Sequence, residues 1–151
     1  MDEINRIKKL IGDHFNGEPW LDVNIVETLK NISAEQAAKK IDNLNSIWQI
    51  VNQMILWREV LWKKLNGNTV FVSENNFFEE IENTSENEWK LLLKRLEHSQ
   101  KIILNFLSEQ IQFDYDNVFQ NGHTYYEHLQ AILQHDAYHL GQIVLLKKLI
   151  Q

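Results

Sequence analysis

The chain has 151 residues, a formal net charge of −6 at pH 7 and no cysteine. Its length suits a single domain with a full hydrophobic core, and the lack of cysteine excludes disulfides and a thiolate nucleophile from the protein itself. No block of Lys or Arg and no long apolar run occurs, so we expect neither a nucleic-acid partner nor a membrane span. The N-terminal stretch Met1-Asp2-Glu3 is too charged for a signal peptide, and we expect a cytoplasmic protein.

Four long segments carry apolar residues at helical spacing. They are predicted as helices over residues 2–15, 47–65, 86–109 and 124–149. Capping-box sequences that begin at Ser46, Ser85 and Thr124 mark the starts of the last three helices. Because each helix has one broad apolar face, the sequence predicts an all-α four-helix bundle that occupies residues 1–151 as one domain.

The first two long helices are joined by a long connection with short extra helices. Residues 23–29 and 34–40 are expected to be helical. We expect Trp20, just after the turn that ends the first helix, to close one end of the core. A second irregular segment covers residues 66–84 and is expected to contain a short helical turn near residues 77–81.

A histidine pair lies on the inward face of the last predicted helix. His135 and His139 are four residues apart, so their imidazoles share one face, one turn from each other. Ile132, Ile143 and Leu146 continue this face, and a neutral imidazole among apolar residues needs a polar partner. The spacing alone more often reflects carboxylate, carbonyl or water partners, and a divalent metal is the alternative. A third metal ligand would have to come from elsewhere in the chain.

Four further residues are candidates for a pocket around this pair. Gln53 lies on the inward side of the predicted helix over residues 47–65, where an amide needs hydrogen-bond partners. Tyr138 and Gln142 flank the histidines and are candidates to line the pocket, although packing is an equally good interpretation of Tyr138. His128 lies two helical turns before His135 on the same face, which makes it a weaker pocket candidate.

The other ionisable residues on or near these helices are interpreted as structural or solvent-exposed residues rather than as metal ligands. Asp136 points about 100° away from His135 on a helix, so it is a poor ligand for the same metal and is expected to support a neighbour or to pair on the surface. His14 falls on the inward stripe of the first helix and is interpreted as a partly buried residue near a helix C-terminus. His98 and His123 are expected to be solvated.

The order of motifs along the chain resembles the DinB-like superfamily, which includes the YfiT-like proteins described as metal-dependent hydrolases. The resemblance spans nearly the whole chain and is most specific in the last motif. The motifs are Gly17-x-Pro19-Trp20, Ile47-Trp48-Gln49-Ile50-Val51-Asn52-x-Met54-x-x-Trp57-Arg58-Glu59 and His135-Asp136-Ala137-Tyr138-His139-x-Gly141-Gln142-Ile143.

The resemblance implies a four-helix bundle, often dimeric, in which three histidines surround nickel, zinc or a similar divalent ion. Two of these histidines match His135 and His139, whereas the third position is Gln53 in this chain. An amide oxygen is neutral, harder and a weaker ligand for zinc or nickel than imidazole, so we expect weaker metal binding than at a three-histidine site. The resemblance also implies hydrolase activity, or transferase activity with a low-molecular-weight thiol.

The sequence is therefore compatible with two alternative functions. In the first, a divalent metal on His135 and His139, with Gln53 or water completing the site, activates a water or a thiol, and no catalytic side chain is assigned. In the second, a non-catalytic dimeric bundle or small-ligand-binding module keeps relics of the site, and Gln53 hydrogen-bonds to a histidine. A homodimer is expected because the last helix is apolar almost all round over residues 140–149.

Overall fold

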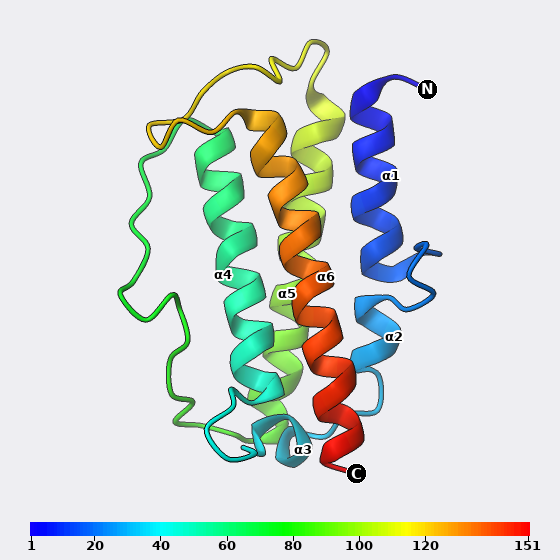
Figure 1. Ribbon diagram of the computed structural model, residues 1–151, viewed down its shortest axis with the longest axis vertical. Coiled ribbons are helices and arrows are strands. Elements are labelled where there is room, and N and C mark those ends of the chain that lie inside the picture. Colours follow the sequence, from blue (N-terminus) through cyan, green and yellow to red (C-terminus); the bar gives the residue numbers. More distant parts are fainter.

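The computed structural model describes all 151 residues and contains six α-helices and no strand (Figure 1). Four helices are long and run side by side, which confirms the predicted all-α bundle. Two short helices lie in the connection between the first two long ones, as predicted. The helices are α1 (Glu3–Asn16), α2 (Ile25–Leu29), α3 (Ala34–Ala38), α4 (Ile47–Leu65), α5 (Glu86–Glu109) and α6 (Tyr125–Leu149).

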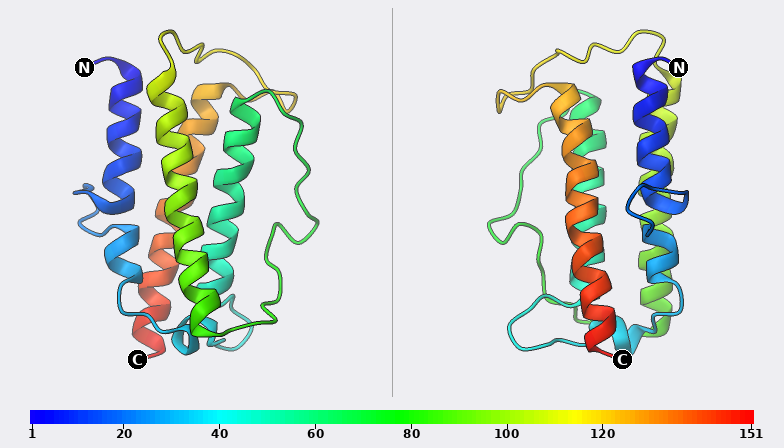
Figure 2. Two further views of the ribbon diagram at one scale, coloured as in Figure 1. Left: turned by 180° about the vertical axis from the view of Figure 1, so that it is seen from behind. Right: turned by 45° about the vertical axis from the view of Figure 1, so that its right-hand side comes forward.

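Helix α4 packs against both α5 and α6, and this trio forms the centre of the bundle. Helix α1 packs against α5 and α6, and α2 continues along α6 below it, so the two together complete the fourth column (Figure 2). Helix α3 closes the end of the bundle where it contacts α4 and α5. No helix is long and apolar enough to cross a membrane.

The core consists of two apolar clusters with a buried polar layer between them. One cluster joins α2, α3 and the first half of α4 to the second half of α6, and the other joins α1 and the end of α4 to the first half of α6. Arg58, Gln100 and Asp136 are all buried, and each lies in sequence between the residues that its helix gives to the two clusters. Apolar packing therefore stabilises both ends of the bundle, and a buried ion pair lies in the layer between them.

Helix starts follow the capping signals of the sequence. Ser33, Ser46 and Thr124 each make the reciprocal capping box, in which the side chain of the third helical residue returns to the cap. Ser85 caps α5 by accepting a hydrogen bond from Glu88 N at 3.3 Å, without a return bond from the Glu88 side chain. Each cap satisfies backbone N–H groups that the first turn leaves unpaired.

Four local predictions about the connections were wrong, and one of them is the end of α3, which lies at Ala38 rather than residue 40. Trp20 is 98% exposed, because the turn closed by Asp22 N and Pro19 O at 3.0 Å carries it away from the core. Helix α2 begins at Ile25 rather than residue 23, since Asn24 caps it by accepting from the backbone of its first turn. Residues 77–81 form no helical turn, and Phe77 instead has a left-handed backbone with φ +64°.

Candidate functional site

The two predicted site histidines meet on α6 through their outer ring nitrogens. His135 Nε2 and His139 Nε2 are 3.1 Å apart, and the rings stand nearly perpendicular, at 84°. Two nitrogens that each lie 2.0–2.1 Å from one tetrahedral zinc ion would be about 3.3 Å apart. The helical spacing therefore brings the two imidazoles to the separation that joint binding of one ion requires.

Gln142 fixes the protonation pattern of the second histidine. Its Oε1 lies 2.6 Å from His139 Nδ1, and an amide oxygen can only accept, so His139 Nδ1 carries the proton. The other ring nitrogen, His139 Nε2, then presents its lone pair toward His135. This is the arrangement by which a hydrogen-bonded neighbour orients a ligating histidine in metal sites.

Both histidines are held in the neutral form that a metal ligand needs. Burial, together with the neighbouring His139 and Arg58, lowers the pKa of His135 from 6.5 to about 4. Burial also lowers the pKa of His139, although the hydrogen bond from its ring to Gln142 opposes this shift. A neutral pair costs no proton release when an ion binds at pH 7.

Gln53 is 1% exposed and is anchored through only one side of its amide. Its Nε2 donates to the backbone oxygen of Asn76 at 3.2 Å, whereas its Oε1 is buried with no hydrogen-bond partner. His135 Nδ1 is also buried without a partner. An unpaired buried acceptor costs about 1–3 kcal/mol, so this oxygen lacks a partner that a cation or a donor would supply.

The loop over Asn76–Phe78 joins Gln53 to the histidine pair. Asn76 accepts from Gln53 through its backbone oxygen, and its Oδ1 accepts from Trp57 Nε1 at 3.1 Å. Phe77 packs edge-on against Trp57 with centroids 5.7 Å apart, and Phe78 lies 6.1 Å from the His139 ring. Trp57 in turn lies 6.1 Å from the His135 ring. The loop thus contacts Gln53, Trp57 and His139, and Trp57 connects it to His135.

A buried ion pair supports the site from the core side. Arg58 Nη2 donates to Asp136 Oδ2, and Arg58 Nη1 donates to Gln100 Oε1, with Arg58 and Asp136 only 1% and 2% exposed. Burial raises the pKa of Asp136, which the Arg58 guanidinium counteracts. Each partner directly follows a site residue, Trp57 on α4 and His135 on α6. The pair therefore fixes how the two helices present Trp57 and His135 to each other.

The expectation that Asp136 pairs on the surface is wrong, because the residue is buried. Its contact with Arg58 agrees with the prediction that it is a poor metal ligand. From the sequence, Arg58 is named only within a motif, and neither its burial nor its pairing is predicted. The signal was present, because Arg58 is four residues after Met54 and three before Leu61, both of which belong to the apolar stripe. A charge at a core position predicts a buried partner of opposite sign, and Asp136 occupies such a position on α6.

The remaining candidates fall into different surroundings. Tyr138 is 65% exposed and packs its ring edge against His139, with centroids 5.1 Å apart. His14 is half-buried in the last turn of α1, as expected. His98 is exposed, as predicted.

No group of three His, Cys, Asp or Glu side chains is placed to hold a metal ion, so any third protein ligand must be of another type.

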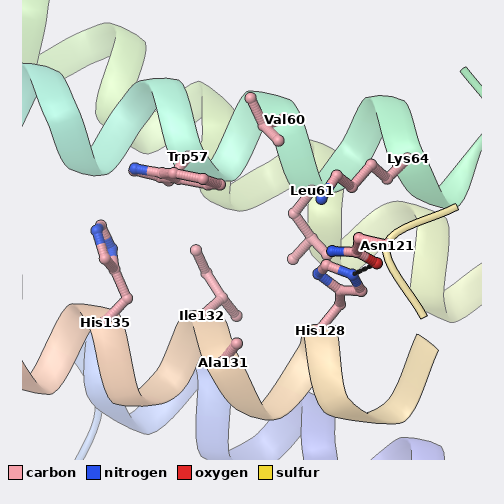
Figure 3. Close-up of a pocket in the computed structure, with 9 residues that line it drawn as sticks. All are labelled: Trp57, Val60, Leu61, Lys64, Asn121, His128, Ala131, Ile132 and His135. Atoms are coloured by element: carbon pink, nitrogen blue, oxygen red, sulfur yellow. Dashed lines mark hydrogen bonds between the residues drawn. The ribbon is translucent and has the colours of Figure 1, made fainter. Parts of the chain in front are cut away.

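A groove of about 270 Å³ runs between α4 and α6 beside the histidine pair (Figure 3). His135 stands at one end below Trp57, and Ile132 lies in the middle. His128 stands at the other end, so it lines the same groove as His135 without approaching His139. The groove gives a small molecule direct access to the His135 side of the pair.

The fold and the site define an all-helical bundle with a pair of adjoining histidines on its last helix and a buried amide on α4. The family model described as the DinB superfamily matches residues 23–143 of the chain. The protein belongs to the DinB superfamily. No match was found among curated proteins, and none among solved structures.

Proposed function

We propose that the protein binds one divalent ion, nickel or zinc, and uses it in a hydrolytic or thiol-dependent transfer reaction. The ligands would be His135 Nε2, His139 Nε2 and Gln53 Oε1, with one position left for water or substrate. The observation that carries the proposal is the 3.1 Å separation of the two imidazole nitrogens, one of which Gln142 leaves unprotonated.

The buried amide of Gln53 fits the third position. Its nitrogen is tied to Asn76, so the oxygen is fixed in orientation and unpaired. A carbonyl oxygen is an acceptable but weak ligand for zinc or nickel, and the loss of one imidazole lowers the affinity. The protein then supplies two strong ligands and one weak one. Such a site needs a higher free concentration of the ion to be filled than a three-histidine site does.

The chemistry follows from what such an ion does when bound. A divalent ion lowers the pKa of a coordinated water or thiol and so provides a nucleophile at neutral pH. The protein's own part is to orient His139 through Gln142, to exclude water with Trp57 and the Asn76–Phe78 loop, and to admit substrate along the groove at His135. A low-molecular-weight thiol is the proposed partner for the transfer reaction.

Metal titration tests this proposal. Protein purified without a nickel column and stripped with a chelator should bind one zinc or nickel ion per chain in calorimetry at pH 7.5. His135→Ala should abolish this binding, whereas His98→Ala, which removes an exposed histidine on α5, should leave it unchanged. Equal loss in both variants, or binding that survives the change at His135, would contradict the assignment.

A second candidate function is a metal-free module that binds a small ligand. The hydrogen bond expected from Gln53 to a histidine is not made, because its amide nitrogen donates to Asn76 and its oxygen is unpaired. The supporting observation is instead that the pair can satisfy itself, since His135 Nε2–H can donate to the bare Nε2 of His139 over 3.1 Å. Wild-type protein that binds no ion, while Gln53→His binds one per chain, would select this function over the metal-dependent one.

A homodimer and a cytoplasmic location complete the proposal. The dimer rests on exposed apolar side chains along α6, of which Leu145 and Leu149 are 57% and 55% exposed. Apolar side chains gathered on one helix face mark an interaction surface. The location rests on the acidic, cysteine-free composition.

A further inference from the structure

The groove between α4 and α6 is polar at both ends and apolar between them. His135 forms one end, while Lys64, Asn121 and His128 gather at the other (Figure 3). The middle is lined by carbon-rich side chains, including Ile132. Binding sites for small molecules have this composition, with an apolar body and a few placed polar groups that fix orientation.

The end remote from the histidine pair has one free positive charge. None of the ion pairs in the structure includes Lys64, whose Nζ lies 5.7 Å from the centre of the Phe119 ring. Burial lowers the pKa of Lys64, so an anionic partner would stabilise its charged form. Lys64 therefore has no carboxylate partner at this end, in a chain whose net charge is −6.

The other polar groups at this end are neutral hydrogen-bonding groups. Burial lowers the pKa of His128 to about 4, with Lys64 and His123 acting in the same direction and Glu127 opposing them. His128 Nε2 lies 3.4 Å from Asn121 Oδ1. One cation beside a neutral imidazole and an amide matches a monoanion such as carboxylate, since a dianionic phosphate would keep an uncompensated charge.

The spacing of the two ends sets the length of the ligand. His128 and His135 are seven residues apart on α6, which corresponds to about 10 Å at 1.5 Å per residue. We propose that this groove binds a small monocarboxylate with an unbranched or flat apolar body of this length, its carboxylate at Lys64 and its far end at His135. The inference extends the proposed function by naming its substrate class, but the anion end needs no metal.

The test uses chelator-treated full-length protein, so that failure of the metal proposal does not affect it. Calorimetric titration of octanoate, an eight-carbon carboxylate of matching length, should show binding at one site per chain. Octanol should bind at least tenfold more weakly, because it lacks the charge, and octyl phosphate should bind no more tightly than octanoate. Octanol equal to octanoate, or octyl phosphate tighter than it, would overturn the proposal, as would no binding of octanoate up to about 10 mM, roughly tenfold above a 1 mM dissociation constant.

Matched variants locate the site. Lys64→Gln should weaken octanoate binding about tenfold, whereas Lys63→Gln removes the same charge from the same helix turn outside the groove and should leave the affinity unchanged. Ala131→Phe, at an exposed position on the groove wall, should block binding, and Gln134→Phe, exposed outside it, should not. Equal effects within either pair would contradict the assignment to this groove, provided that thermal melting confirms folding.

Discussion

At the scale of single residues, the oxygen of Gln53 decides how strongly the proposed centre holds its ion. Gln53→His should raise zinc or nickel affinity tenfold or more, because imidazole replaces a weak amide oxygen on a side chain that is already buried against the Asn76 loop. The gain should fall as the pH drops below about 6.5, since the new histidine must be neutral to bind. Calorimetric titration at pH 7.5 and pH 6 measures both effects.

The control for this prediction is His135→Ala in the Gln53→His background, which should remove the gain. If wild type and Gln53→His bind the ion equally well, Gln53 does not occupy the third ligand position.

The buried pair of Arg58 and Asp136 makes a separate residue-scale prediction. Arg58→Ala leaves a carboxylate in the core without its partner, which should lower the free energy of unfolding by about 3–5 kcal/mol. Arg95→Ala breaks the exposed pair with Glu59 and should cost less than about 1 kcal/mol. Urea unfolding followed by circular dichroism compares the two.

The double variant Arg58→Met/Asp136→Leu should recover most of the lost stability, because it removes both charges together. A double variant no more stable than Arg58→Ala would show that packing around Arg58, rather than the unpaired charge, causes the loss.

The histidine pair was visible in the sequence, whereas its supports were not. His135 and His139 share a face by spacing alone, and Gln53 follows from the inward stripe of α4. The positions of Arg58 and Asp136 on apolar stripes were visible, but the two residues are 78 positions apart, so no local pattern shows that they meet. The Asn76 loop was equally hidden, because its backbone bends through left-handed conformations at Asn76 and Phe77 that asparagine tolerates but phenylalanine disfavours.

At the scale of elements, the interface of α4 and α6 should respond to acid through two histidines. The pKa values of His135 and His128 are about 4 in the folded chain, below the 6.5 of an unperturbed histidine. Between these values the unfolded chain binds more protons, so stability is fully present above about pH 6.5 and is lost as the pH falls toward 4. Urea unfolding at pH 6.5, 5.5 and 4.5 measures this slope.

The control is the variant His128→Gln/His135→Gln, whose loss of stability over the same interval should be smaller, because two of the groups that titrate are gone. Parallel curves for wild type and variant would mean that carboxylates alone cause the loss.

Helix boundaries were predictable wherever the sequence contains a capping motif. Helix α4 begins after Ser46 and ends at Leu65, as expected, because the capping box and the apolar stripe agree. The exposure of Trp20 was not predictable, since a turn such as the one closed by Asp22 N and Pro19 O can direct an aromatic side chain toward the core or toward solvent. Local sequence signals therefore predicted the helices. The conformations of the loops depend on tertiary contacts, which local signals do not show.

At the scale of the whole molecule, α6 has one face in the bundle and exposed apolar residues on another. Tyr138, Leu145 and Leu149 are spaced seven and four residues apart, so they share one side of the helix. We expect a dimer through this side, with a mass near twice 18.0 kDa by light scattering, and a monomer for Leu145→Glu, which buries a charge in the interface. A wild-type mass near 18.0 kDa at micromolar concentrations would count against it.

The four-column architecture followed from composition and periodicity, because amphipathic helices of this length can bury their faces only against each other. The division of its core by a polar layer did not follow, since it depends on the register in which Arg58, Gln100 and Asp136 meet. That register also sets where His135 stands relative to Trp57 and the groove. The stability of the bundle and the geometry of the candidate site therefore share one set of contacts.

The most direct test of the metal centre is a long-range proton–nitrogen NMR spectrum of the histidine side chains during zinc titration. In the metal-free protein, His139 should show the tautomer protonated at Nδ1, because that nitrogen donates to Gln142. With one equivalent of zinc, Nε2 of both His135 and His139 should move to the shift of metal-bound nitrogen, while His98 should not change. Spectra in which both site histidines keep their metal-free shifts at saturating zinc would contradict the account.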